Sequence, residues 1–319
     1  MKKYFGLLII LLFAACESPD TNSQKNIPVI GFVDMFKDET IDLARQGFYA
    51  ALKANGFKPD SSIQIIYRNA QNDQPTLLQA IDYCISQNVT MIATNTTIPT
   101  ISAAQKTKTL PVCMMVAPSP KLAGLLDENG NPPANLFGVY DTLAYIDTAF
   151  SLIKSVMPGV KKVGLIFDQS EPQSNDALKE LQVNCTKNNI QLVSLPVNNS
   201  SETQTVMQAL ILNKIDAFFA LPDNTIFASF ETIVKSCNDM EIPIFTSEAG
   251  LVKRGAVAGF GADLYQWGYQ AGLQAVQYLK QGNMDGLKPE YLTKRIKMYN
   301  PQVNRMFHFR FDSSFKTVK

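Results

Sequence analysis

Short strand-like and helix-like segments alternate along this chain from Pro28 almost to its C-terminus. The runs "PVIGFV", "SIQIIYR" and "TMIAT" are short and apolar, as is typical of buried strands. Between them, residues 41–52 and 77–85 place their apolar side chains on one face of a helix. Strands buried on both faces and joined by helical crossovers form parallel sheets, so the alternation predicts an α/β fold.

The alternation runs twice. The irregular loop "GLLDENGNPPAN" ends the first run, and the pattern resumes with "KKVGLIF", "IQLVSLPV", "IDAFFAL" and "IPIFTS" as further strands. Two runs of one pattern predict two similar doubly wound parallel-sheet lobes joined by a hinge.

The N-terminus has the organisation of a signal peptide. Lys2 and Lys3 precede the apolar run "YFGLLIILLF", and two alanines stand directly before Cys16. The stretch "FAAC" resembles the lipobox of bacterial lipoproteins, which implies that Cys16 becomes the lipidated N-terminus. The alternative is an ordinary signal peptide in which Cys16 has no special role. The polar stretch "ESPDTNSQKN" then predicts a tether between the anchor and the folded domain.

Composition excludes several classes of function. The formal net charge is +1, and no cluster of Lys and Arg indicates a nucleic-acid partner. No strand is followed by a phosphate loop or dinucleotide fingerprint, so no cofactor is expected. The spacing of Cys84, Cys113, Cys185 and Cys237 fits no metal site, and buried free thiols are expected instead.

Polar residues gather where the predicted strands end. Ligands of open α/β sheets bind at the carboxyl ends of the strands. The candidate ligand-binding residues are Asp34, Asn95, Thr96, Thr97, Tyr140, Asp141, Ser170, Glu171, Ser174, Asp223, Asn224, Glu248 and Asp263. Several of them could equally cap a helix, and the two roles are compatible because a helix start also binds carboxylates.

The acidic members of this set indicate the charge of the ligand. Asp141, Glu171, Glu248 and Asp263 favour a bound cationic group, and the hydroxyl and amide groups offer donors to an anionic one. Together they suit a zwitterion such as an amino acid. Solvated acidic residues at loop ends are the alternative.

Three segments, "VGLIFDQSEPQSN", "ALPDNT" and "SEAGLVKRGAVAGFGADLYQWGYQAG", resemble ABC-transporter substrate-binding lipoproteins of the tryptophan/tyrosine-binding type. The similarity extends over residues 27–299 and implies the type I periplasmic-binding-protein fold. It also implies a monomer in the cell envelope, anchored through Cys16, whose two lobes close over a small amino-acid-like ligand and present it to an ABC permease. The resemblance favours aromatic amino acids as ligands. The segment "DMFKDET" and Tyr140 differ from the residues usual in the family, so other hydrophobic acids or small metabolites stay as alternatives.

The resemblance also assigns the candidate residues to parts of the site. Lobe 1 contributes Thr96 and Thr97, the crossing between the lobes contributes Tyr140 and Asp141, and the returning crossing contributes Asp263. Lobe 2 contributes Ser170, Glu171, Ser174, Asp223, Asn224 and Glu248.

The expected organisation assigns every residue to a segment. The segments are 1–15 (signal peptide), 16–26 (lipidated tether), 27–140 with 259–283 (lobe 1), 141–258 with 284–312 (lobe 2) and 313–319 (tail). Hinge crossings are therefore expected near Tyr140, Gly259 and Asn283.

Two other functions use the same residues. A sensor subunit of a membrane receptor would have the same fold and the same site. A hydrolase would need the single histidine, His308, or a carboxylate pair such as Glu171 and Glu248. No "GxSxG" elbow is present, and a binding protein without enzymatic activity is expected.

Overall fold

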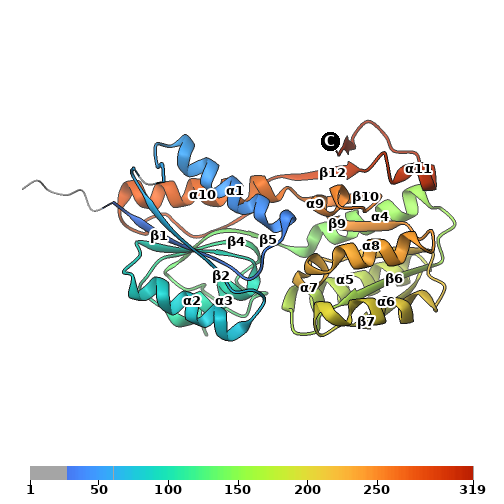
Figure 1. Ribbon diagram of the computed structural model, residues 1–319, viewed down its shortest axis with the longest axis horizontal. Helices are drawn as coiled ribbons and strands as arrows, with labels where there is room; N and C mark the ends of the chain where they lie inside the picture. The colour runs from blue at the N-terminus through green and yellow to red at the C-terminus, as the bar shows by residue number, and fades with distance from the viewer. Residues whose placement is uncertain (1–26, 60, 319) are drawn as a thin grey trace, which may run out of the picture.

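The computed structural model describes residues 27–59 and 61–318, which form two lobes lying side by side along the longest axis of the molecule (Figure 1). The signal peptide, Cys16 and the tether predicted for residues 1–26 lie outside the described residues. None of the helices in the described part is both long and apolar enough to cross a membrane.

Lobe 1 is a six-stranded sheet with helices on both faces. Its strand order is β11-β5-β4-β3-β1-β2, with every pair parallel. The strands are β1 (Val29–Asp34), β2 (Gln64–Asn69), β3 (Met91–Asn95), β4 (Val112–Pro118), β5 (Leu136–Asp141) and β11 (Pro289–Tyr291). The helices are α1 (Glu39–Ala54), α2 (Gln74–Ser86), α3 (Thr97–Lys106) and α10 (Leu264–Gln281). Helices α1 and α10 pack together, as do α2 and α3.

Lobe 2 is a seven-stranded sheet of order β13-β12-β10-β9-β8-β6-β7. Its strands are β6 (Lys162–Phe167), β7 (Gln191–Pro196), β8 (Ala217–Ala220), β9 (Ile244–Glu248), β10 (Ala258–Ala262), β12 (Arg295–Tyr299) and β13 (Lys316–Thr317). Its helices are α4 (Ile146–Val156), α5 (Pro172–Lys187), α6 (Thr203–Ile211), α7 (Asn224–Ala228), α8 (Phe230–Asn238), α9 (Ala249–Lys253) and α11 (Asn304–Phe307), with short 3-10 turns at Leu143–Tyr145 and Ser200–Glu202. Strand β12 is antiparallel to β10, whereas the other pairs are parallel.

The predicted α/β fold with two parallel-sheet lobes is therefore confirmed. The expected buried free thiols are confirmed as well: Cys84, Cys113, Cys185 and Cys237 are all buried and unpaired in the described chain. One buried apolar cluster runs from lobe 1 through α10 into lobe 2, and a second lies within lobe 2.

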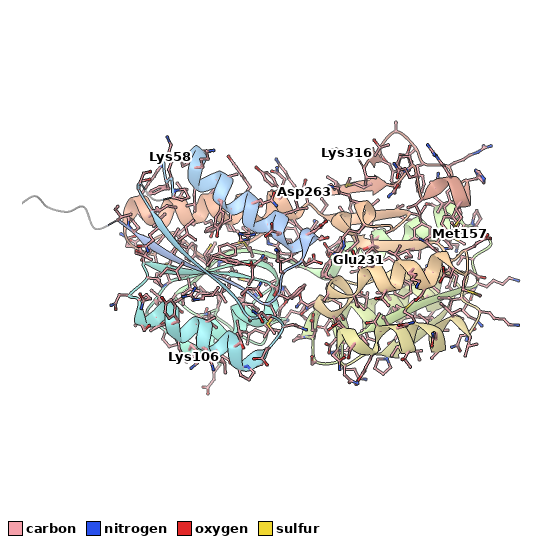
Figure 2. All side chains as sticks on the ribbon, viewed as in Figure 1. Lys58, Lys106, Met157, Glu231, Asp263 and Lys316 are labelled. Atoms are coloured by element: carbon pink, nitrogen blue, oxygen red, sulfur yellow. The ribbon has the colours of Figure 1, made fainter. Side chains whose placement is uncertain are left out.

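Two of the three expected crossings lie later in the chain than predicted. Strand β10 pairs with β9 in lobe 2, so residues 259–262 belong to lobe 2 and the chain crosses at Asp263. Strand β11 pairs with β5 in lobe 1, and the last crossing follows Leu292, not Asn283. Figure 2 shows Asp263 at the junction of the lobes.

The C-terminal segment also differs from the expected tail. Strand β13 pairs with β12, and the ring of Phe315 packs against the rings of Tyr299 and Phe311. Residues 313–318 are thus part of lobe 2, because β13 pairs with β12 and the ring of Phe315 covers apolar surface that would otherwise face water.

Helices α1 and α10 approach so closely that their backbones are in contact. A Cβ atom on Gly268 would lie 1.7 Å from the carbonyl oxygen of Ala44, and one on Gly47 would lie 2.0 Å from that of Tyr265. No side chain fits between two backbones at this distance. These two glycines therefore set the spacing of the helix pair.

We predict that Gly268→Ala lowers the free energy of unfolding by about 2–3 kcal/mol, because the methyl group forces the two backbones apart. Urea unfolding followed by circular dichroism measures this change. Gly159→Ala is the control, since no atom lies within 4 Å of the added Cβ. Equal stability of the two variants would contradict the proposed close packing.

Candidate ligand-binding site

A cavity lies between the two lobes, at the carboxyl ends of both sheets. It contains about 460 Å³ of empty space, including the part open to solvent. It is lined by Thr97, Val116, Ala117, Pro118, Asp141, Thr142, Leu143, Tyr145, Gln173, Pro222, Asn224, Phe227, Glu248 and Trp267. Four of the candidate residues are in this set: Thr97, Asp141, Asn224 and Glu248.

Part of the cavity wall is apolar. Trp267 from α10, Phe227 from α7 and Leu143 from the first crossing contribute to it. The indole N–H of Trp267 donates a 2.7 Å hydrogen bond to the carbonyl of Val139. Because this bond satisfies the only polar atom of the indole, the ring offers apolar surface to the cavity.

Two buried carboxyl groups face the cavity beside this wall. The Tyr145 hydroxyl donates a 3.0 Å hydrogen bond to Glu248 Oε1, and the Thr142 N–H and the Arg295 guanidinium donate to Asp141 Oδ1. The second oxygens, Glu248 Oε2 and Asp141 Oδ2, are buried and have no hydrogen-bond partner in the described chain. Two acceptors are therefore available to a ligand.

Burial controls the protonation of this pair. It raises the pKa of Glu248 to about 8, an effect to which the negative charge of Asp141 adds and which the Tyr145 hydroxyl opposes. Burial also raises the pKa of Asp141 to about 6, against the influence of Arg295. A bound cation would favour the charged form of both groups.

Two amide side chains complete the polar lining from lobe 2. Gln173 Oε1 and Asn224 Nδ2 are buried without a partner among the described residues. Behind them, the carboxyl group of Glu171 accepts from Gln173 Nε2 and, at 3.1 Å, from the Asn224 N–H. Burial raises the pKa of Glu171 well above its usual range. Glu171 thus holds the Gln173 side chain and the Asn224 backbone, and it does not itself line the cavity.

The backbone is strained at two places on the lobe 1 side. Thr96 precedes α3 with φ of 79°, makes no capping hydrogen bond, and has a buried Oγ1 without a partner in the described structure. Val116, which lines the cavity, has φ of 51° where the register of β4 against β5 shifts. A positive φ is costly for a β-branched residue and often marks a functional site.

Other candidates from lobe 2 support the site from outside the cavity lining. The Asp223 carboxylate caps α7 by accepting from the Ile226 N–H and also accepts from the Ser174 hydroxyl at 2.6 Å. Ser170 donates both its N–H and its hydroxyl to Asp168. These contacts fix the segments that lead into α5 and α7, whose first turns carry Gln173 and Asn224.

The remaining candidates lie farther from the cavity wall. Asp34 faces Arg45 at 3.7 Å, and Asn95 donates from its amide to the Ile41 carbonyl, so both are buried within lobe 1. Tyr140 packs edge-on against Tyr291, and Asp263 caps α10.

Sequence reasoning missed several lining residues, chiefly Gln173, Tyr145, Phe227 and Trp267. Trp267 stands one helical turn after the crossing at Asp263, a position that faces the junction. His308 caps α11 in lobe 2 and is not a lining residue. Within residues 27–59 and 61–318, no group of three or more His, Cys, Asp or Glu side chains could hold a metal ion.

Comparison with known proteins identifies the family. The sequence profile of ABC transporter substrate-binding proteins matches residues 26–305. The chain belongs to this family. The family expected from the sequence is thereby confirmed.

This substrate-binding protein is similar to a tyrosine-binding protein from Clostridioides difficile strain R20291, at 34% identity over 264 residues, or 83% of this chain and 75% of the relative. Its fold matches an ABC domain from Streptococcus pneumonia in complex with L-Trp, with a TM-score of 0.82, 24% identity, and coverage of 90% and 96% of the two chains. It also matches a ligand-free, open substrate-binding protein with adhesive properties from Clostridium difficile, with a TM-score of 0.69, 26% identity, and coverage of 92% and 99%.

We predict that the substrate-binding protein becomes less stable between pH 4.5 and 8 and that Glu248→Gln removes part of this loss. The unfolded carboxyl group releases its proton near pH 4.5, whereas the folded one holds it until about pH 8, so the folded state binds more protons in this window and stability falls as pH rises. Gln cannot ionise. The free energy of unfolding of Glu248→Gln, compared with that of wild type, should therefore rise by roughly 2–4 kcal/mol between pH 4.5 and pH 9.

Urea unfolding at a series of pH values, without added amino acid, measures both profiles. Glu290→Gln on the exposed strand β11 is the control. Parallel profiles for Glu248→Gln and wild type would show that Glu248 ionises normally.

Proposed function

We propose that this protein binds a free amino acid with a large apolar side chain between its lobes and delivers it to an ABC permease. The observation that carries the proposal is the cavity itself, where unpartnered buried acceptors, an unpartnered donor and an apolar wall lie together. Buried polar atoms are almost always paired in folded proteins, so this concentration of unpaired atoms favours a ligand that pairs them.

The ammonium group of the amino acid is assigned to the carboxyl pair. Asp141 Oδ2 and Glu248 Oε2 are both buried acceptors, and a cation between them would form charge-assisted hydrogen bonds. Gln173 Oε1 offers a third acceptor from α5.

The α-carboxylate is assigned to donors from both lobes. Asn224 Nδ2 is the donor from lobe 2, and the uncapped start of α3, with Thr96 Oγ1, offers donors from lobe 1. The N-terminus of a helix favours an anion, because its first N–H groups are unpaired and its dipole is positive there. The apolar side chain of the ligand would then lie against Trp267 and Phe227.

The relatives support this ligand class and the closed arrangement of the lobes. One is named a tyrosine-binding protein, and another contains L-Trp. The TM-score is higher against the L-Trp complex than against the open, ligand-free structure, although the latter is slightly more similar in sequence. A rotation between two rigid lobes lowers the score for the whole chain, so the comparison favours a closed state.

Delivery to the permease and attachment to the membrane complete the proposal. The lipobox-like "FAAC" supports lipid attachment at Cys16, with the folded monomer outside the cytoplasm. The family supports an ABC permease as the partner.

We predict that L-tyrosine, L-tryptophan or L-phenylalanine binds in isothermal titration calorimetry, and that both charged ends are needed. Tyramine lacks the carboxylate and 4-hydroxyphenylpropionate lacks the ammonium group, so each leaves buried protein groups unpaired. Each should bind at least about 30-fold more weakly than tyrosine. Equal affinity of the analogue without an ammonium group would contradict the role assigned to Asp141 and Glu248.

A further inference from the structure

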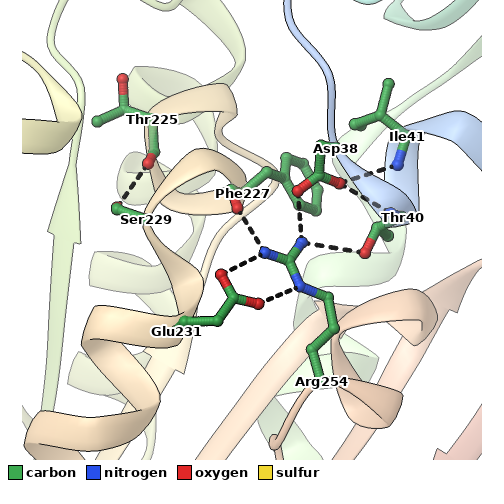
Figure 3. Close-up of polar contacts among 8 residues, drawn as sticks. All are labelled: Asp38, Thr40, Ile41, Thr225, Phe227, Ser229, Glu231 and Arg254. Carbon is green, nitrogen blue, oxygen red and sulfur yellow. Dashed lines mark hydrogen bonds and ion pairs between the residues drawn. The ribbon is translucent and has the colours of Figure 1, made fainter.

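One arginine of lobe 2 reaches across the junction to lobe 1. Arg254 follows α9 as its C-cap, and its Nε and Nη2 atoms each donate a 2.9 Å hydrogen bond to the carboxylate of Glu231 (Figure 3). Nη2 also donates to the Phe227 carbonyl at 2.8 Å. These three residues belong to lobe 2, so the guanidinium group is held in place independently of lobe 1.

The remaining nitrogen of Arg254 bonds to lobe 1. Nη1 donates to Asp38 Oδ2 at 2.6 Å and to Thr40 Oγ1 at 3.2 Å. The other oxygen of Asp38 caps α1 by accepting from the N–H groups of Thr40 and Ile41, as Figure 3 shows. The side chains of Asp38 and Arg254 are only 4% and 11% exposed, so this ion pair is largely shielded from water.

A close steric contact lies beside the ion pair. A Cβ atom on Gly250 of α9 would stand 2.1 Å from Thr40 Cγ2. Glycine therefore allows α9 to touch the start of α1. Because neither helix is part of a hinge crossing, both this contact and the ion pair exist only while the lobes are together.

We propose that Asp38, Thr40, Gly250 and Arg254, here named the rim contact, stabilise the closed state and raise the affinity for ligand without touching it. The proposal rests on closure of the two lobes over a ligand, as in the proposed function. None of the four residues lines the cavity.

Opening of the lobes changes the contacts of Arg254. Separation of the lobes removes Asp38 and Thr40 from Arg254, whereas Glu231 and the Phe227 carbonyl remain with it in lobe 2. The closed state thus gains a charge-assisted hydrogen bond that the open state lacks. A contact present in only one state shifts the population toward that state, and the apparent dissociation constant falls accordingly.

Asp38→Asn tests the ion pair. Asparagine caps helices as well as aspartate does, so α1 keeps its cap while the charge opposite Arg254 is lost. We expect a dissociation constant for L-tyrosine or L-tryptophan about tenfold higher than that of wild type, the scale of one charged hydrogen bond. Small-angle scattering of the ligand-free protein should give a larger radius of gyration.

Asp82→Asn is the matched control. It removes a carboxylate that pairs with Lys106 at 2.9 Å within lobe 1, and it should change neither affinity nor radius. The proposal is overturned if Asp38→Asn behaves like this control in both measurements. Because the radius is measured without ligand, that result is distinct from a failure of the proposed ligand class.

Gly250→Ala tests the steric contact between Gly250 and Thr40, and Thr40→Ser in the same chain is expected to reverse its effect. Alanine suits a helix, but its methyl group meets Thr40 Cγ2 and should hold the lobes apart, with a larger radius and weaker binding. Thr40→Ser removes Cγ2 and keeps the hydroxyl that bonds to Arg254, so the double variant should regain most of the affinity. A double variant as weak as Gly250→Ala would refute the contact as the cause.

Discussion

The backbone contact between α1 and α10 is the constraint on which the junction of the lobes depends. Gly47 and Gly268 let the two helices touch without intervening side chains. Helix α10 begins at the crossing from lobe 2 and brings Trp267 to the cavity, and α1 follows its N-cap Asp38, which bonds to Arg254. The spacing of this pair thus places both the apolar wall of the cavity and the lobe 1 side of the rim contact.

The hinge and the ligand site share a carboxyl group. Asp141 ends β5 at the first crossing, where it pairs with Arg295 from β12 after the last crossing. The Arg295 guanidinium also lies over the ring of Tyr145, whose hydroxyl holds Glu248. Under the proposed function, the ligand's ammonium group lies near Asp141 and Glu248 and therefore acts on the segments that join the lobes, which couples binding to closure.

Parts of the site could be predicted because strand ends are marked in the sequence. Thr97, Asp141, Asn224 and Glu248 all follow or end an apolar strand, and parallel strands bring such residues to one edge. The crossings at Gly259 and Asn283 were wrong for local reasons. The glycines of β10 are typical of a turn, yet they allow close pairing with β9, and β11 is three residues long, too short to show a period.

The sequence by itself determined the α/β class, the two lobes and the polar character of the strand ends, because these depend on the order and period of side chains along the chain. The family came from the resemblance of three segments to known proteins. Only the tertiary structure decided which polar atoms remain unpaired. Ser170, Ser174 and Asp223 have the same chemistry as the lining residues, but they use their hydrogen bonds within lobe 2. The pairing of Arg254 with Asp38 across the lobes could not be predicted from the sequence either. The two residues are 216 positions apart, and only the packing of the lobes brings them together.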